Sequence, residues 1–173
     1  MMGIEIQILD WIQNIRTPFL DMVVPFISQL GNAGIIWIVL AALMLLMPKT
    51  RRSGLILALA LIADLILCNV ILKNLIARTR PYDVNTAVNL LIAKPVDYSF
   101  PSGHTAASFA SVTALYLAGE KKLWKLALIP AVLIAFTRMY LYVHYPTDIL
   151  GGIAVGIVSG YIGFFIVRKK SQF

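Results

Sequence analysis

The segment SGLILALALIADLILCNVIL, residues 53–72, decides the fold class of this chain. A membrane-spanning helix needs about 20 predominantly apolar residues, and this segment supplies them with Asp64 as its one charged residue. The whole 173-residue chain has the same character, being 60% apolar and 13% charged, with a mean hydropathy of +0.83. Soluble domains carry about 25% charged residues. The composition therefore excludes a water-soluble globular protein, and it excludes a disordered chain as well.

Four other apolar segments resemble residues 53–72 in length and character. The predicted spans are residues 31–47, 53–72, 103–118, 123–143 and 146–167. Residues 1–30 are more mixed, and their apolar side chains recur at helical spacing, which predicts an amphipathic helix on the membrane surface. A sixth span within residues 1–30 is the alternative. The chain is thus predicted to be an all-α polytopic membrane helix bundle.

A single domain accounts for the whole length, residues 1–173. Residues 1–30 form its interfacial helices, residues 31–173 its transmembrane core, and residues 79–100 a polar loop. Three short basic clusters indicate how this domain is oriented. They hold nine of the fifteen Lys and Arg residues and follow the first, third and fifth predicted spans: Lys49, Arg51 and Arg52; Lys121, Lys122 and Lys125; Arg168, Lys169 and Lys170.

Cytoplasmic loops of membrane proteins collect Lys and Arg, so these clusters predict a cytoplasmic end, and the loops at 79–100 and 144–147 then face outward. The net charge of +7 is explained by this topology, and no nucleic-acid partner is predicted.

A second set of ionisable residues gathers at the outward ends of the spans and in the outer loop. Such residues are costly in a membrane and usually functional. They are Lys73, Arg78, Arg80, Lys94, Arg138 and Asp148, together with both histidines, His104 and His144. Lys73 and Arg80 are seven residues apart, which would place them on one face of a helix. Taken alone, each has the alternative of snorkelling to the interface.

Two short motifs add chemistry to these cations. Pro-Ser-Gly-His at 101–104 precedes an apolar run, so Ser102 can cap a helix whose free N–H groups bind anions, and Gly103 permits close backbone approach. A plain helix start with an incidental histidine is the alternative.

The second motif is His144 followed four residues later by Asp148. Pro146 suits the first turn of a helix, which would place Asp148 within reach of His144. A carboxylate that accepts one imidazole N–H leaves the other nitrogen as a base or nucleophile. A purely structural His–Asp hydrogen bond is the alternative.

Together these residues predict a phosphoryl-transfer site. Three cations, a helix N-terminus and two histidines suit a reaction whose catalysis consists mostly of positioning and charge stabilisation. The single cysteine, Cys68, and the single carboxylate beside the histidines give poor support to a metal site. Neither a metal nor another cofactor is predicted.

On these residues the chain resembles the type 2 phosphatidic acid phosphatases, a family of membrane lipid phosphatases. Its signature is K-x6-R-P, P-S-G-H and S-R-x5-H-x3-D, and every spacing matches. The matching residues are Lys73 with Arg80-Pro81, then Pro101 to His104, then Thr137-Arg138, His144 and Asp148. Thr137 departs from the usual serine but keeps a hydroxyl.

The resemblance implies a metal-independent lipid phosphatase that acts through a phosphohistidine. His144 would be the nucleophile, Asp148 would orient it, and His104 would be the general acid. Residues 79–100 would be the outer active-site loop. The implied phosphate-binding residues are Lys73, Arg80, Arg138, Ser102 and Gly103.

The predicted outward site and the short chain favour one substrate among those of the resembled family. That substrate is undecaprenyl diphosphate, hydrolysed to undecaprenyl phosphate on the extracytoplasmic face of a bacterial plasma membrane. Partners are then the lipid phosphate substrate and membrane lipids. The alternatives are a phosphatidylglycerol phosphate or phosphatidic acid phosphatase, a non-catalytic lipid-binding or transport relative, and an anion channel. Asp64 lies mid-span, where a hydrogen bond to a neighbouring helix is the expected role.

Overall fold

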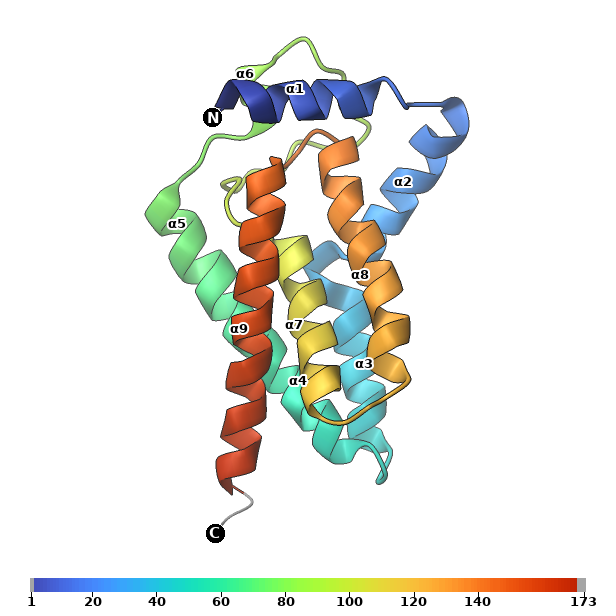
Figure 1. The fold of residues 1–173 in the computed structure, drawn as a ribbon, viewed down its shortest axis with the longest axis vertical. Helices are drawn as coiled ribbons and strands as arrows, with labels where there is room; N and C mark the ends of the chain where they lie inside the picture. Colours follow the sequence, from blue (N-terminus) through green and yellow to red (C-terminus); the bar gives the residue numbers. More distant parts are fainter. Residues whose placement is uncertain (1, 171–173) are drawn as a thin grey trace.

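The structure is a computed structural model that describes residues 2–170, and all of its regular elements are helices (Figure 1). The α-helices are α1 (Met2–Gln13), α2 (Pro18–Leu30), α3 (Ile35–Leu46), α4 (Arg51–Asp64), α5 (Lys73–Ile76), α6 (Pro81–Val84), α7 (Gly103–Leu117), α8 (Leu123–Tyr140) and α9 (Pro146–Lys170). A 3₁₀ turn, η1 (Asn32–Gly34), precedes α3, and a π-helix, η2 (Leu65–Leu72), joins α4 to α5.

Helix α7 forms the centre of the bundle, with α3, α4, α8 and α9 around it (Figure 1). Its alanines are buried, Ala106 and Ala110 among them. The facing side of α9 carries glycines, and a Cβ on Gly156 would stand 2.5 Å from the Ala106 carbonyl oxygen. Small residues let two helix backbones approach closely in a membrane protein. This contact places the first turn of α9 beside the start of α7.

Three described helices are long and apolar enough to cross a membrane, namely Arg51–Val84, Leu123–Tyr140 and Pro146–Lys169. A fourth crossing arises if Pro18–Leu30 and Asn32–Leu46, bent by 43°, form one broken span. The bend falls at Ala33 and Gly34, which both have positive φ. The predicted number of five or six spans is therefore not confirmed, because α3 and α7 are separate helices of only 12 and 15 residues.

The helix that contains residues 53–72 ends sooner than the spacing of its cations suggested. It continues through η2 into α5 and stops at Ile76, after which Ala77 adopts a left-handed conformation with φ of 48°. The prediction that Lys73 and Arg80 share a helix face is wrong, because Arg80 lies beyond this end. The predicted loop at 79–100 also contains one helical turn, α6.

Helix α1 lies across one end of the bundle, beside α6 (Figure 1). Leu9 and Ile12 are buried beneath it, whereas Ile4, Ile8 and Trp11 are exposed. Its placement at a membrane surface stays a prediction. The turn between α3 and α4, the α7–α8 connection and the end of α9 all lie at the opposite end (Figure 1). The three basic clusters therefore share one end of the molecule.

Candidate active site

Six residues of the three-part signature line one cavity at the end of the bundle that α1 covers. The cavity has a volume of about 470 Å³. Its polar wall comes from α2, η1, α5, α7, α8 and the connecting loops. It comprises Ser28, Gln29, Asn32, Lys73, Arg80, Asp97, His104, Arg138 and His144, with Gly103 beside them. Six of the eight predicted site residues thus line a common space.

His144 lies in the short connection between α8 and α9, where Tyr142 has a positive φ of 60°. Its Nδ1 is 3.4 Å from Asp148 Oδ2, a long contact that falls short of a good hydrogen bond. Its Nε2 is 3.3 Å from Nη1 of Arg80. A guanidinium only donates, so Nε2 is the unprotonated nitrogen and Nδ1 carries the proton toward Asp148.

Burial is the main influence on the protonation of His144. It lowers the pKa of this imidazole to about 3, with Arg80 and Arg138 acting in the same direction and Asp148 opposing them. His144 as a whole is 1% exposed. His144 is therefore neutral at pH 7 and presents a lone pair at Nε2 to the cavity, as a nucleophile requires.

Asp148 is fully buried and accepts several hydrogen bonds besides its contact with His144. Its Oδ2 accepts from the backbone N–H of Tyr145 at 2.8 Å and from the hydroxyl of Ser99 at 2.5 Å. Its Oδ1 accepts from Arg78 at 2.6 Å. These donors hold the carboxylate next to Nδ1 of His144.

Asp97 bridges the two cations that the signature contributes from its first part. Arg80 Nη2 lies 2.6 Å from its Oδ1, and Lys73 pairs with its Oδ2. Partial burial raises the pKa of Asp97, but the ion pairs with Lys73 and Arg80 prevail and hold it at about 2. The carboxylate occupies the place between these cations that a phosphoryl group would need. The motif spacing did not identify Asp97. A cluster of cations does, however, indicate that an anionic side chain should lie nearby.

Arg138 reaches the cavity from the last turn of α8. It donates to the hydroxyl of Ser28 on α2, and its buried Nε has no partner in the described residues. Thr137 instead donates its hydroxyl to the Ile134 carbonyl at 2.6 Å. The Thr137 hydroxyl, at the position where the signature has serine, therefore bonds to the helix backbone.

His104 stands at the start of α7 and lines the same cavity as His144. Its Nε2 is 2.8 Å from the amide oxygen of Asn32 in η1. Because that oxygen accepts, Nε2 carries the proton. His104 is thus a donor where His144 is an acceptor, which is the division of roles that an acid and a nucleophile need.

Ser102 and Gly103 take different places. Ser102 is the N-cap of α7, and its buried hydroxyl accepts from the Thr105 N–H at 3.4 Å and the Thr105 hydroxyl at 3.0 Å. It is buried and is not among the residues that line the cavity. Gly103 lines the cavity, and a Cβ there would stand 2.9 Å from Oδ1 of Asn69.

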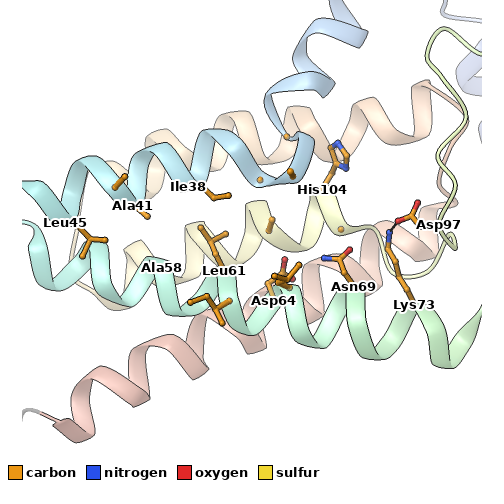
Figure 2. Close-up of a pocket in the computed structure, with 18 residues that line it drawn as sticks. Ile38, Ala41, Leu45, Ala58, Leu61, Asp64, Asn69, Lys73, Asp97 and His104 are labelled. Atoms are coloured by element: carbon orange, nitrogen blue, oxygen red, sulfur yellow. Dashed lines mark hydrogen bonds and ion pairs between the residues drawn. The ribbon is translucent and has the colours of Figure 1, made fainter.

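A second cavity opens from the same site and runs along the bundle between α3 and the α4–η2 segment (Figure 2). Its volume is about 570 Å³, and most of its wall is apolar, with Ile38, Leu45 and Leu61 among the labelled side chains (Figure 2). The two cavities share Lys73, Asp97, Gly103 and His104. The polar site thus continues into an apolar groove.

The described residues contain no group of three or more His, Cys, Asp or Glu side chains placed to hold a metal ion. The carboxylates near the histidines are instead engaged with arginine and lysine.

Comparisons with known proteins find relatives that match most of this chain. An undecaprenyl-diphosphatase of Sulfolobus acidocaldarius is 31% identical over 169 residues, which cover 98% of this chain and 80% of the relative. Phosphatidylglycerophosphatase B of Bacillus subtilis is 34% identical over 167 residues, covering 89% and 76%. The crystal structure of LpxE from Aquifex aeolicus superposes with a TM-score of 0.77 at 30% identity, covering 92% of this chain and 93% of that one.

The family model described as the PAP2 superfamily matches residues 53–172, which include every residue of the three-part signature. The match extends over more than half of the chain, and it agrees with the helical bundle and with the cavity in which the signature residues meet. The chain belongs to the PAP2 superfamily, whose phosphatases are hydrolases that act on lipid phosphate esters.

Proposed function

We propose that this protein removes a phosphate from a membrane lipid through a phosphohistidine at His144. The observation that carries the proposal is the placement of His144, whose Nε2 contacts Nη1 of Arg80 in a cavity that Lys73 and Arg138 also line. A neutral imidazole can attack phosphorus, and fixed cations stabilise the charge on the three non-bridging oxygens.

The reaction has two steps. His144 Nε2 forms a bond to phosphorus while the bond from phosphorus to the leaving oxygen breaks. His104 takes up a proton when the anionic phosphate binds, enters this step as an imidazolium, and donates its Nε2 proton to that oxygen. His104, now neutral and unprotonated at Nε2, takes a proton from water as the water oxygen attacks the phosphohistidine. The N–P bond then breaks, inorganic phosphate leaves, and both histidines return to their starting states. Asp148 stabilises the positive charge on His144 in both steps. The proposed chemistry uses no metal and no cofactor.

Gly103 and the N-terminus of α7 contribute backbone N–H groups toward the same phosphate. In this proposal Ser102 acts through the cap that fixes this helix start. Asp97 must leave Lys73 and Arg80 when a phosphate arrives, because one oxyanion replaces the other.

We propose undecaprenyl diphosphate as the substrate, with undecaprenyl phosphate as the product. The apolar groove that leaves the site supports a long hydrocarbon chain, and the relative from Sulfolobus acidocaldarius bears the name undecaprenyl-diphosphatase. The basic clusters at the far end of the bundle support an extracytoplasmic site in a cell membrane.

A glycerolipid phosphate is the second candidate substrate, and one observation favours it. Asp64 and Asn69 bring polar side chains into the groove (Figure 2), and one carboxylate oxygen of Asp64 has no partner in the described residues. A prenyl chain offers these groups nothing, whereas the ester oxygens of a glycerolipid can accept hydrogen bonds from the Asn69 amide and from Asp64 in its protonated form. If phosphatidylglycerol phosphate is the substrate, Asp64→Leu lowers its turnover and leaves that of undecaprenyl diphosphate unchanged.

The test is phosphate release by purified protein in detergent with EDTA present. Undecaprenyl diphosphate, phosphatidylglycerol phosphate and phosphatidic acid are compared, with His144→Ala as the control. We expect EDTA-resistant turnover that disappears in the variant, and kcat/KM then ranks the lipids. A folded protein that releases phosphate from none of them would refute the proposal.

A further inference from the structure

The N-terminal helix reaches the catalytic centre through a buried carboxylate. Glu5 on α1 is 6% exposed. Its Oε2 lies 2.6 Å from Arg78 Nη2, and its Oε1 accepts from Thr147 at the backbone N–H, at 3.2 Å, and at the hydroxyl, at 2.5 Å. A buried carboxylate with three donors is an ordered part of the structure.

The guanidinium of Arg78 forms ion pairs with two carboxylates. Its Nη2 binds Glu5, and its Nη1 lies 2.6 Å from Asp148 Oδ1 and 2.6 Å from the Thr147 hydroxyl. The guanidinium carbon also lies 3.9 Å above the ring of Tyr145. The arginine is therefore held in place from three sides and can act as a fixed charge.

The charges of this group do not cancel. Glu5 and Asp148 carry two negative charges, and Arg78 carries one positive charge. One negative charge therefore remains to stabilise a positive imidazole at His144. Without the charge of Glu5, Arg78 would neutralise Asp148 by itself, and no net charge would remain.

We propose that Glu5 and Arg78 are positioning residues that set the electrostatic support Asp148 gives to His144. The inference rests on the proposed phosphohistidine function. Arg78 fixes the carboxylate of Asp148 in place, and Glu5 offsets the charge that Arg78 would otherwise impose on it. Helix α1 thereby becomes part of the catalytic apparatus, although it lies outside the residues that the family model matches.

The other charged and titratable groups facing His144 stay unchanged in the variants proposed below; they are Arg80, Arg138 and His104. Any change in the behaviour of His144 would then come from the group formed by Glu5, Arg78 and Asp148.

The central variant is Glu5→Gln, which keeps the size of the side chain and removes its charge. We expect kcat to fall about tenfold, from a Coulomb effect on His144 across a partly buried site, with KM changed less than about twofold because the phosphate-binding cations are untouched. The acid limb of kcat/KM should move to lower pH. Glu5→Asp, which keeps the charge, should recover most of kcat.

Two control variants separate charge from anchoring. Asp10→Asn removes a carboxylate from the same helix. The carboxylate of Asp10 accepts a hydrogen bond from the Tyr142 hydroxyl at 2.6 Å and contacts neither Arg78 nor Asp148. Thr147→Val removes the hydroxyl that Glu5 holds but leaves all charges in place. Both controls should keep the acid limb of the parent protein.

A binding measurement tests the inference without any lipid. Vanadate readily takes five ligands and can accept a bond from His144, whereas inorganic phosphate senses only the cations. By calorimetry in detergent, Glu5→Gln should weaken vanadate binding about tenfold and leave phosphate binding within about twofold. Parent protein that binds vanadate yet hydrolyses no lipid phosphate would defeat the proposed function and leave this inference standing.

Three results would overturn the inference. One is a Glu5→Gln protein with unchanged kcat and vanadate affinity. Another is equal weakening of vanadate and phosphate together with a lower melting temperature, which would show that Glu5 only anchors α1. The third is the same loss in Thr147→Val as in Glu5→Gln.

Discussion

Arg80 and Asp97 are joined by a 2.6 Å ion pair, and Arg80 Nε also donates to the Asp97 backbone carbonyl at 2.8 Å. The side chain of Asp97 is 48% exposed, whereas that of Arg80 is 4% exposed. The cation is therefore built into the protein, and its carboxylate partner sits at the solvent side. Such a carboxylate competes with any phosphate that approaches Arg80.

Replacing Asp97 by asparagine should tighten the binding of anions. We expect the inhibition constant of inorganic phosphate to fall about three- to fivefold, the range expected for loss of a half-exposed ion pair. Asp83→Asn, an exposed change in the same loop, should leave the inhibition constant unchanged. Weaker phosphate inhibition in Asp97→Asn would instead show that Asp97 holds Lys73 and Arg80 in position for phosphate binding.

The role of His104 predicts a dependence on the leaving group. His104→Gln should slow hydrolysis of phosphatidic acid by about 10²–10⁴-fold, the contribution of a general acid, because an alkoxide must otherwise leave. An aryl phosphate with an acidic phenol needs no such proton, so its phenol should be released in the first turnover at nearly the parent rate, although later turnovers slow because His104 also takes the proton of the attacking water. Rapid-mixing kinetics of the first turnover on the two substrates, with His144→Ala as the inactive reference, measure this difference. Equal losses in the first turnover on both substrates would exclude His104 as the acid.

The buried state of His144 predicts the pH dependence of the free enzyme. Burial lowers the pKa of His144 to about 3 from the usual 6.5. The reactive form is the neutral one, which exists above the pKa, so a lowered pKa extends activity toward acid. We expect kcat/KM to show no loss attributable to His144 between pH 7 and pH 5. A pH profile with an aryl phosphate, whose own ionisation is corrected for, measures this. An acid limb near 6.5 would contradict the prediction.

The contact between α7 and α9 predicts a stability effect. A Cβ on Gly156 would lie 2.5 Å from the Ala106 carbonyl oxygen and 2.8 Å from the Ala110 nitrogen, and neither backbone atom can move aside. Gly156→Ala should destabilise the fold by about 1–3 kcal/mol through overpacking, measured as a lower melting temperature in detergent. Gly3→Ala, which meets nothing within 4 Å, is the matched control. An unchanged melting temperature in Gly156→Ala would mean that α7 and α9 can move apart without a loss of stability.

Much of the site could be predicted because its parts are local in the chain. His144 and Asp148 are four residues apart at a helix start, and Ser102 caps the helix that carries His104. Helical geometry alone brings such neighbours together. The apolar segments likewise predicted helices, since a chain with so little charge has to satisfy its backbone groups internally within a membrane.

Local periodicity failed where the backbone changed direction. The seven-residue spacing of Lys73 and Arg80 matches a helix face only if the helix continues, and Ala77 ends it with a positive φ. The two cations still meet, but through Asp97 in a loop that no periodic pattern describes. The number of spans failed for a related reason, since the break at Ala33 and Gly34 separates α2 from α3.

Composition and spacings of a few residues were enough to predict the membrane class, the helical segments and the residues of the three-part signature. The partners that those residues meet depend on the packing of the whole molecule. Arg78 pairs with Glu5 across 73 positions, His104 with Asn32 across 72, and Arg138 with Ser28 across 110. Such contacts depend on how helices pack and where loops turn, and no short-range pattern in the chain encodes them.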